Sequence, residues 1–136
     1  MNRLLVIFAG GVAAVALAAP ALAAGNVQIT IRHQMRGCHA WAVGNGAYKA
    51  SQTLTVARGT ALKFTDNDVM PHTLIQVAGP RVALHGPRMA MIGASTTISL
   101  RTPGTYRFTT KAGEDYMPGM KTIGEDNVLR LVVVVT

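Results

Sequence analysis

The chain has 136 residues, carries a formal net charge of +7 at pH 7 and contains one cysteine. This length suits a single domain with one hydrophobic core once a short leader is removed. One cysteine excludes an internal disulfide, so the thiol must be buried, pair with another molecule or bind a ligand.

The first residues indicate export. Asn2-Arg3 form a short basic start, the run from Leu4 to Ala19 is apolar, and Ala21-Leu22-Ala23 fits the small-x-small cleavage rule. The apolar run is too short for a comfortable transmembrane span. We therefore expect residues 1–23 to be a secretory signal peptide and residues 24–136 to form one periplasmic or otherwise exported domain. No transmembrane anchor is expected after cleavage; the alternative is an uncleaved N-terminal anchor.

The charge is distributed unevenly. Glu114, Asp115, Glu125 and Asp126 are four of the six acidic residues. In an exported protein a basic balance favours an acidic protein partner or an anionic membrane surface. We therefore expect an acidic partner and no nucleic acid, and the alternative is a charged surface that is merely solvated.

Apolar and polar residues alternate along most of the chain after the leader, which predicts strands. Turn signals such as Arg58-Gly59 and Pro103-Gly104 separate these segments. The resulting count of about seven strands predicts an all-β sandwich or barrel. Residues 36–50 and 111–127 are rich in glycine and are predicted to be long loops, which usually carry function. The alternating segments lie around residues 27–31, 54–56, 60–65, 73–77, 98–101, 106–109 and 128–135.

Sulfur and imidazole side chains are clustered in the sequence. Thiolate, thioether and imidazole together form the ligand set of copper, whereas zinc would recruit more Cys, His or carboxylate at tight spacing. One of the clusters, Met70-Pro71-His72, follows a predicted strand, where the proline fixes the backbone ahead of the imidazole. The clusters are His33, Met35, Cys38 and His39; Met70 and His72; His85, Met89 and Met91; and Met117 and Met120.

A family resemblance follows from the order of three motifs. Asn67-x-x-Met70-Pro71-His72, then Gly104-Thr105-Tyr106-Arg107-Phe108, then a Met-Pro-Gly-Met loop before a valine-rich strand resemble the cupredoxins. These are small exported copper proteins, and the resemblance covers the chain from about residue 54 onward. It implies a cupredoxin-like Greek-key β-sandwich that binds one copper ion, as Cu(I) or Cu(II).

The resemblance assigns only part of the metal site. It implies His72 as the first imidazole ligand and Met120, or less well Met117, as the axial ligand. The cysteine of the family would stand where this chain has Thr110, and no histidine follows within residues 111–121. An ordinary blue-copper centre with its cysteine before the last strand is therefore excluded.

The first predicted turn offers replacement ligands. In such a sandwich this turn gathers with the other two loops at one end, and it carries Cys38 and His39. The sequence therefore predicts a non-standard copper site of Cys38 and His72, completed by Met117 or Met120 and by His39.

Each candidate also has a structural alternative. Cys38 could be a buried inert thiol or form an intermolecular disulfide, and His39 could be exposed beside Trp41. His72 could be a structural turn histidine, and Met117 or Met120 could fill the core or contact a partner. His33 continues the inward parity of its strand, which favours a hydrogen-bonded core imidazole. The cluster at His85, Met89 and Met91 is expected on a surface loop.

Two functions are consistent with these features. The first is an exported copper-binding protein, acting as a single-electron carrier or in periplasmic copper handling, with an acidic redox or copper-handling partner. The alternative is a metal-free cupredoxin-like binding module that interacts with an envelope or redox partner. No Ser-His-Asp arrangement or nucleophile elbow occurs, so an enzyme is not predicted.

Overall fold

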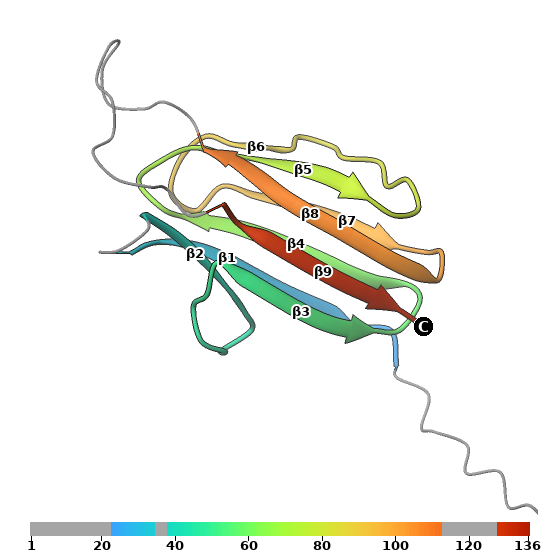
Figure 1. The fold of residues 1–136 in the computed structure, drawn as a ribbon. Coiled ribbons are helices and arrows are strands. Elements are labelled where there is room, and N and C mark those ends of the chain that lie inside the picture. Colours follow the sequence, from blue (N-terminus) through green and yellow to red (C-terminus); the bar gives the residue numbers. More distant parts are fainter. Residues whose placement is uncertain (1–22, 35–37, 113–127) are drawn as a thin grey trace, which may run out of the picture.

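The computed structural model describes residues 23–34, 38–112 and 128–136, so residues 1–22 of the predicted signal peptide lie outside them. Two sheets pack face to face (Figure 1). The first has the order β2 (Cys38–Val43), β1 (Asn26–Gln34), β4 (Thr60–Asn67) and β7 (Ser95–Leu100). The second has the order β3 (Ser51–Val56), β9 (Arg130–Val135), β8 (Gly104–Ala112), β5 (His72–Ala78) and β6 (Arg88–Met89).

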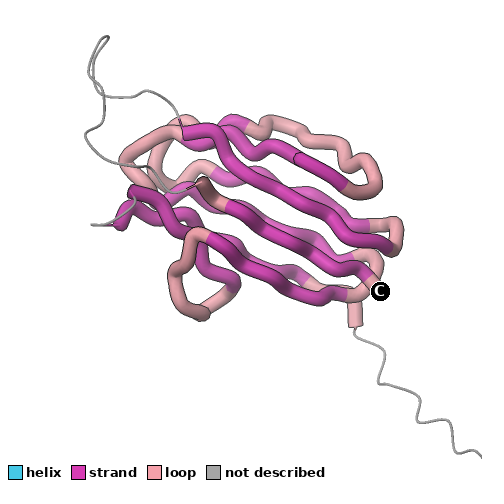
Figure 2. Tube along the Cα trace, in the orientation of Figure 1, coloured by secondary structure: helices cyan, strands magenta, loops and turns pink. Residues whose placement is uncertain are grey.

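The predicted all-β sandwich is confirmed, with nine strands among the described residues in place of about seven. The two additional strands are β2 and the two-residue β6. Strands occupy most of the described trace, and loops join them at the ends (Figure 2). Across the described residues, no helix has the length and apolar character needed to cross a membrane.

The prediction of a loop over residues 36–50 is wrong for β2. Ala40, Trp41 and Ala42 are all buried, so the segment lacks the alternation by which strands are recognised in sequence. It pairs antiparallel with β1, where Trp41 lies opposite Ile31. The hairpin that follows returns to the same strand, because Trp41 and Lys49 exchange backbone hydrogen bonds. Tertiary packing, rather than the local pattern, thus makes this segment a strand.

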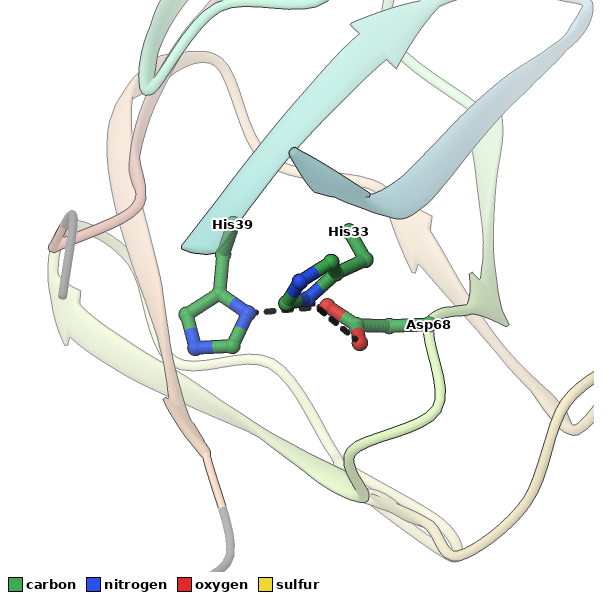
Figure 3. Close-up of side chains that lie close together, drawn as sticks. All are labelled: His33, His39 and Asp68. Atoms are coloured by element: carbon green, nitrogen blue, oxygen red, sulfur yellow. Dashed lines mark hydrogen bonds and ion pairs between the residues drawn. The ribbon is translucent and has the colours of Figure 1, made fainter. Parts of the chain in front are cut away.

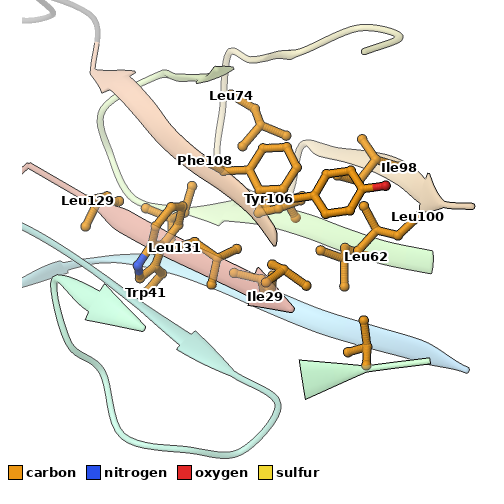
Figure 4. Packing of buried hydrophobic residues seen from close by; sticks show 14 of the residues in the cluster. Ile29, Trp41, Leu62, Leu74, Ile98, Leu100, Tyr106, Phe108, Leu129 and Leu131 are labelled. Atoms are coloured by element: carbon orange, nitrogen blue, oxygen red, sulfur yellow. The ribbon is translucent and has the colours of Figure 1, made fainter. Parts of the chain in front are cut away.

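The core lies between the two sheets (Figure 4). Inward residues of the first sheet, such as Ile29 and Leu62, face Phe108 and Leu131 of the second, and all four are fully buried. The rings of Trp41, Phe64 and Phe108 follow one another at centroid distances of 6.4 and 6.0 Å. This aromatic row crosses from β2 to β8 and holds the sheets together by apolar burial.

Strand register brings the ends of five strands, β1, β2, β4, β5 and β8, to one end of the sandwich. The parallel pairing of β1 with β4 ends at Arg32 and Asn67, and β1 continues beyond it, paired only with β2. There His33 lies opposite His39. At the same end β5 begins at His72, next to the end of β8 (Figure 1). Residues from both sheets can therefore meet at this end.

Candidate metal centre

Asp68 is the buried carboxylate at the centre of this end. It follows β4, and two hydrogen bonds of the turn hold it in place: its backbone N–H donates to Asp66 Oδ1 at 2.9 Å, and the Met70 N–H donates to Asp68 Oδ1 at 3.0 Å. Such Asx-type bonds are what short acidic side chains form in turns. The side chain of Asp68 is 0% exposed, so its carboxylate needs partners inside the protein.

His72 is the first residue of β5, and its side chain is completely buried. Its Nε2 lies 3.2 Å from Asp68 Oδ2, and its Nδ1 lies 3.0 Å from the hydroxyl of Thr110 on β8. When Nε2–H donates a hydrogen bond to Asp68, Nδ1 of the neutral ring accepts a hydrogen bond from the Thr110 hydroxyl. The preceding Met70 is also buried, at 3% exposure, and it lines the turn that precedes the imidazole. The Met-Pro-His turn therefore fixes His72 in the interior.

His39 approaches the same carboxylate from the other sheet. It is the second residue of β2, and its Nδ1 lies 2.8 Å from Asp68 Oδ2. Its ring meets the His72 ring edge to face, with centroids 4.7 Å apart and planes at 89°. Two buried imidazoles, one from each sheet, thus converge on one carboxylate oxygen.

His33 completes the cluster from the rim. Its side chain is 47% exposed, and its Nδ1 lies 3.6 Å from Asp68 Oδ1. Figure 3 shows the rings of His33 and His39 next to the Asp68 carboxylate, with dashed lines for their interactions with its oxygens. The candidate ligand atoms of His33, His39 and Asp68 all lie within 4.8 Å of one another.

The pKa values of the two neighbouring carboxylates, Asp66 and Asp68, are shifted in opposite directions. Burial raises the pKa of Asp66 from 3.8 to about 6, against the opposing hydrogen bond from the Asp68 backbone. Burial also acts to raise the pKa of Asp68, but hydrogen bonds from His39, from the Met70 backbone and from His72 outweigh it and hold that pKa below 3.8. Asp68 is therefore an anion at neutral pH, which is the state that a cation or an imidazolium would require.

The donor atoms fit a small metal ion. Ligand atoms about 2.1 Å from a tetrahedral ion lie about 3.4 Å from one another. His33, His39 and Asp68 have ligand atoms within 4.8 Å of one another, and the nitrogens of His33 and His39 lie 3.6 and 2.8 Å from the Asp68 oxygens, which brackets that spacing. Asp68 can act in two ways, as a ligand or as the carboxylate that orients a metal-bound imidazole through its other nitrogen. Imidazole and carboxylate donors together suit copper or zinc better than calcium or magnesium.

The structure brings together two of the five predicted ligands. His39 and His72 are both buried against Asp68, so an exposed His39 is wrong. Cys38 begins β2 and does not lie on a turn. Its side chain lies outside the described part of the structure, as do Met117 and Met120. The participation of these three sulfur ligands remains a prediction.

Two other expectations are corrected. His33 is not a core imidazole, because β1 extends past the end of β4 and no sheet covers the ring there. His85 and Met91 are exposed as expected, but Met89 is fully buried because β6 pairs with the start of β5.

Asp68 was not predicted as part of the site, although a signal for it exists. Leu62, Phe64, Asp66 and Asp68 are all buried, so the inward parity of β4 continues into two carboxylates. A carboxylate at an inward position needs a buried partner. The spacing of Asp68 and His72 across the Met-Pro turn supplies one.

Comparisons with known proteins bear on the fold. No family model matches the sequence, and no curated protein matches it either. A purple cupredoxin from Nitrosopumilus maritimus is similar with a TM-score of 0.46 and 17% identity, over 80% of this chain and 98% of that one. A reduced Cu(I) form of an amicyanin mutant has a TM-score of 0.49 and 21% identity, over 85% and 86% of the two chains.

A multicopper oxidase is also similar, with a TM-score of 0.49 and 21% identity. It matches 81% of this chain, which spans only 41% of the oxidase chain. The purple cupredoxin and the amicyanin mutant cover at least 80% of this chain, at identities of 21% or less. At these identities and TM-scores the similarity says nothing about which residues bind a metal in this chain.

Proposed function

We propose that this chain is an exported copper-binding protein whose His39 and His72 bind one copper ion beside Asp68. The observation that carries the proposal is the convergence of two buried imidazoles, one from each sheet, on a single buried carboxylate. Apolar residues of similar volume would stabilise such a position at least as well, so a buried polar cluster of this kind points to a functional role.

Copper is favoured over zinc by the sulfur-containing residues that stand next to the described ligands in the sequence or between β8 and β9. Cys38 directly precedes His39 in the sequence, and Met117 and Met120 lie in the segment that joins β8 to β9. Soft thiolate and thioether ligands select Cu(I), whereas imidazole also accepts Cu(II). A bound copper ion would supply one-electron chemistry, as Cu(I) and Cu(II). The proposed role is therefore single-electron transfer or copper handling in the periplasm or another exported location.

The metal-free alternative also has an observation in its favour. Asp68 accepts hydrogen bonds from His39, His72 and the Met70 backbone without any ion. A satisfied network of this kind can simply specify the packing of one end of a sandwich. In that case the protein would be a binding module for an envelope or redox partner.

Metal titration of the mature protein separates these functions. We expect one equivalent of copper to bind, and His39→Gln and His72→Gln each to weaken binding by at least about tenfold, as loss of a ligand or its orienting partner does. His85→Gln is the matched control, because His85 is exposed and outside the cluster. Absence of copper binding by the wild-type protein would leave the metal-free module. Binding of zinc more tightly than both copper ions would also contradict the proposal.

The thiolate of Cys38 has its own test. If it is a ligand, the Cu(II) protein shows a strong sulfur-to-copper charge-transfer band, and Cys38→Ser removes that band. A band that persists unchanged in the variant would exclude Cys38 from the site. Reversible redox cycling of the loaded protein would favour an electron carrier, and rapid loss of Cu(I) to a chelator would favour copper handling.

An acidic partner is proposed on the basis of the surface charge. Among the described residues, both carboxylate side chains, Asp66 and Asp68, are buried, whereas every Lys and Arg is exposed. The described surface therefore presents positive charge without compensating acidic groups. Such a surface attracts an acidic protein and accelerates its association.

A further inference from the structure

Of the four side chains that form the candidate site, three are buried against the core and one, His33, is partly exposed to solvent. The side chains of His39, Asp68 and His72 are 3%, 0% and 0% exposed. His33 is 47% exposed, and its ring centroid lies 6.4 Å from that of His39. A metal ion that reaches the buried donors at this position would meet the ring of His33 before theirs.

His33 is also the one imidazole of the cluster that Asp68 does not hold by a hydrogen bond. Its Nδ1 lies 3.6 Å from Asp68 Oδ1, beyond the usual limit of about 3.2 Å. Its backbone is nevertheless fixed, because it pairs with His39 and the neighbouring Arg32 lies over the Tyr48 ring at 5.6 Å. The ring can therefore turn toward solvent from a fixed base. Rotation of His39 or His72 would instead leave a buried carboxylate without its partner.

We propose that His33 is the entry and exit ligand of the site, an inference that rests on the proposed copper binding. His33 would take the place of one donor of the incoming ion and would then pass the ion to the buried donors His39 and Asp68. The charge of the ion does not change, and no electron is transferred. The ligand atoms of His33, His39 and Asp68 lie within 4.8 Å of one another, a spacing over which His33 could hand an ion directly to the buried donors.

This role differs measurably from that of a permanent fourth ligand. An entry ligand lowers the barrier in both directions, so its loss slows loading and release together and leaves the affinity nearly unchanged. Loss of a permanent ligand would weaken binding, mainly through faster release. The two roles therefore predict opposite changes in the release rate.

The test compares the wild-type protein with His33→Gln, and His85→Gln is the exposed-histidine control. Loading is started with Cu(II) in excess glycine buffer, and release is started with EDTA. Both are followed by stopped-flow fluorescence of Trp41, the only tryptophan, which lies two residues from His39. We expect His33→Gln to slow both rates by roughly tenfold, a barrier increase of about 1.4 kcal/mol. His85→Gln should leave both rates unchanged.

Two results would overturn the inference. Faster release with weaker binding in His33→Gln would make His33 a permanent ligand, and unchanged rates would make it a bystander. His33→Met retains a copper donor, so it should restore rapid exchange of Cu(I); failure of this rescue would also count against entry through this side chain. If the wild-type protein binds no copper, the proposed function fails instead, which this experiment shows before any variant is compared.

Discussion

Asp68 connects every part of the candidate site at the level of single residues. One of its oxygens accepts the Met70 N–H, and the other faces both His39 and His72. Hydrogen bonds to a buried charged group are worth more than neutral ones, about 1.5–3 kcal/mol each. The carboxylate thus links the turn after β4 to β2 and β5 whether or not a metal is bound.

Replacing this carboxylate should therefore destabilise the metal-free protein. We expect Asp68→Asn to lower the free energy of unfolding at neutral pH by about 2–3 kcal/mol. Because the pKa of Asp68 is held below 3.8 in the folded state, its contribution is present above that value and is lost as the pH falls further. Urea unfolding in the presence of EDTA, from neutral pH down to about pH 3, measures the difference. A difference that does not shrink in acid would contradict the assigned ionisation.

Asp66 should behave in the opposite way. Its pKa is raised from 3.8 to about 6, so its favourable contribution is complete below 3.8 and is lost as the pH rises through 6. We expect Asp66→Asn to stabilise the metal-free protein at neutral pH by at most about 3 kcal/mol. This advantage should disappear near pH 4, and the same urea titration reports it. A variant that is less stable than the wild type at every pH would show that the carboxylate is needed for its hydrogen bonds rather than tolerated as a charge.

At the level of elements, the pairing of β5 with β8 sets what lies beside His72. Thr110 stands at the position where the cupredoxin resemblance places a cysteine, and its hydroxyl lies 3.0 Å from His72 Nδ1. The strand geometry for a histidine–thiolate pair is therefore present, although the thiol is not. The sheet holds the two side chains together whichever residue occupies position 110.

Thr110→Cys should use this geometry. If the ion binds His72 through Nδ1, the Cu(II) complex of this variant gains an intense charge-transfer band in the visible spectrum, because a thiolate at position 110 would stand next to that nitrogen. Thr105→Cys is the matched control, since it places a thiol on the same strand at an exposed position. If Thr110→Cys binds copper and shows no such band, His72 Nδ1 does not face the ion.

The end of β5 makes a second element-level prediction. Gly79 has a φ of 103°, and a Cβ there would lie 2.5 Å from the Thr105 carbonyl oxygen. We expect Gly79→Ala to lower the free energy of unfolding by about 2–4 kcal/mol, through backbone strain and the collision with β8. Gly86 also has a positive φ, but a Cβ there would meet nothing within 4 Å. Gly86→Ala should therefore lower the free energy of unfolding by only about 1 kcal/mol. Equal losses in thermal or urea unfolding would exclude the close approach of Gly79 to β8.

At the level of the whole molecule, the described positive charges lie on the surface, away from the buried Asp68. The outer face of the second sheet has a groove of about 350 Å³, lined by apolar residues such as Val77 and Val128 and by Arg107 and Arg130. No exposed carboxylate accompanies these arginines among the described residues. This face therefore combines apolar area with guanidinium groups that suit carboxylates.

Binding to an acidic polymer should reveal this surface. We expect polyglutamate to bind the protein in dilute buffer and to lose at least about tenfold in affinity by about 300 mM salt, as screening shortens the range of surface charge. A double variant with Arg107→Gln and Arg130→Gln should bind polyglutamate more weakly than a control double variant with Arg58→Gln and Lys63→Gln. The control removes the same amount of charge elsewhere on the surface. Fluorescence anisotropy of labelled polyglutamate measures both effects. Equal binding by the two double variants would show that net charge alone is responsible.

Local pattern in the sequence determined much of the fold. The seven predicted strands correspond to β1, β3, β4, β5, β7, β8 and β9, because each has one buried and one exposed face. The segment around Trp41 was missed because its neighbours Ala40 and Ala42 are buried as well, so no alternation marks it. His72 was identified because the Met-Pro-His turn fixes an imidazole by local backbone geometry.

The sequence by itself thus determined an all-β chain with His72 held at the start of a strand, since these features depend on near neighbours. Only the tertiary structure decided which side chains meet there. Asp68, His39 and His33 come together through the pairing of β1 with β2 and with β4, and through the packing of two sheets. Such contacts depend on register and strand length over long sequence separations. For that reason the end of β1 leaves His33 at the surface, while β2 carries His39 inside.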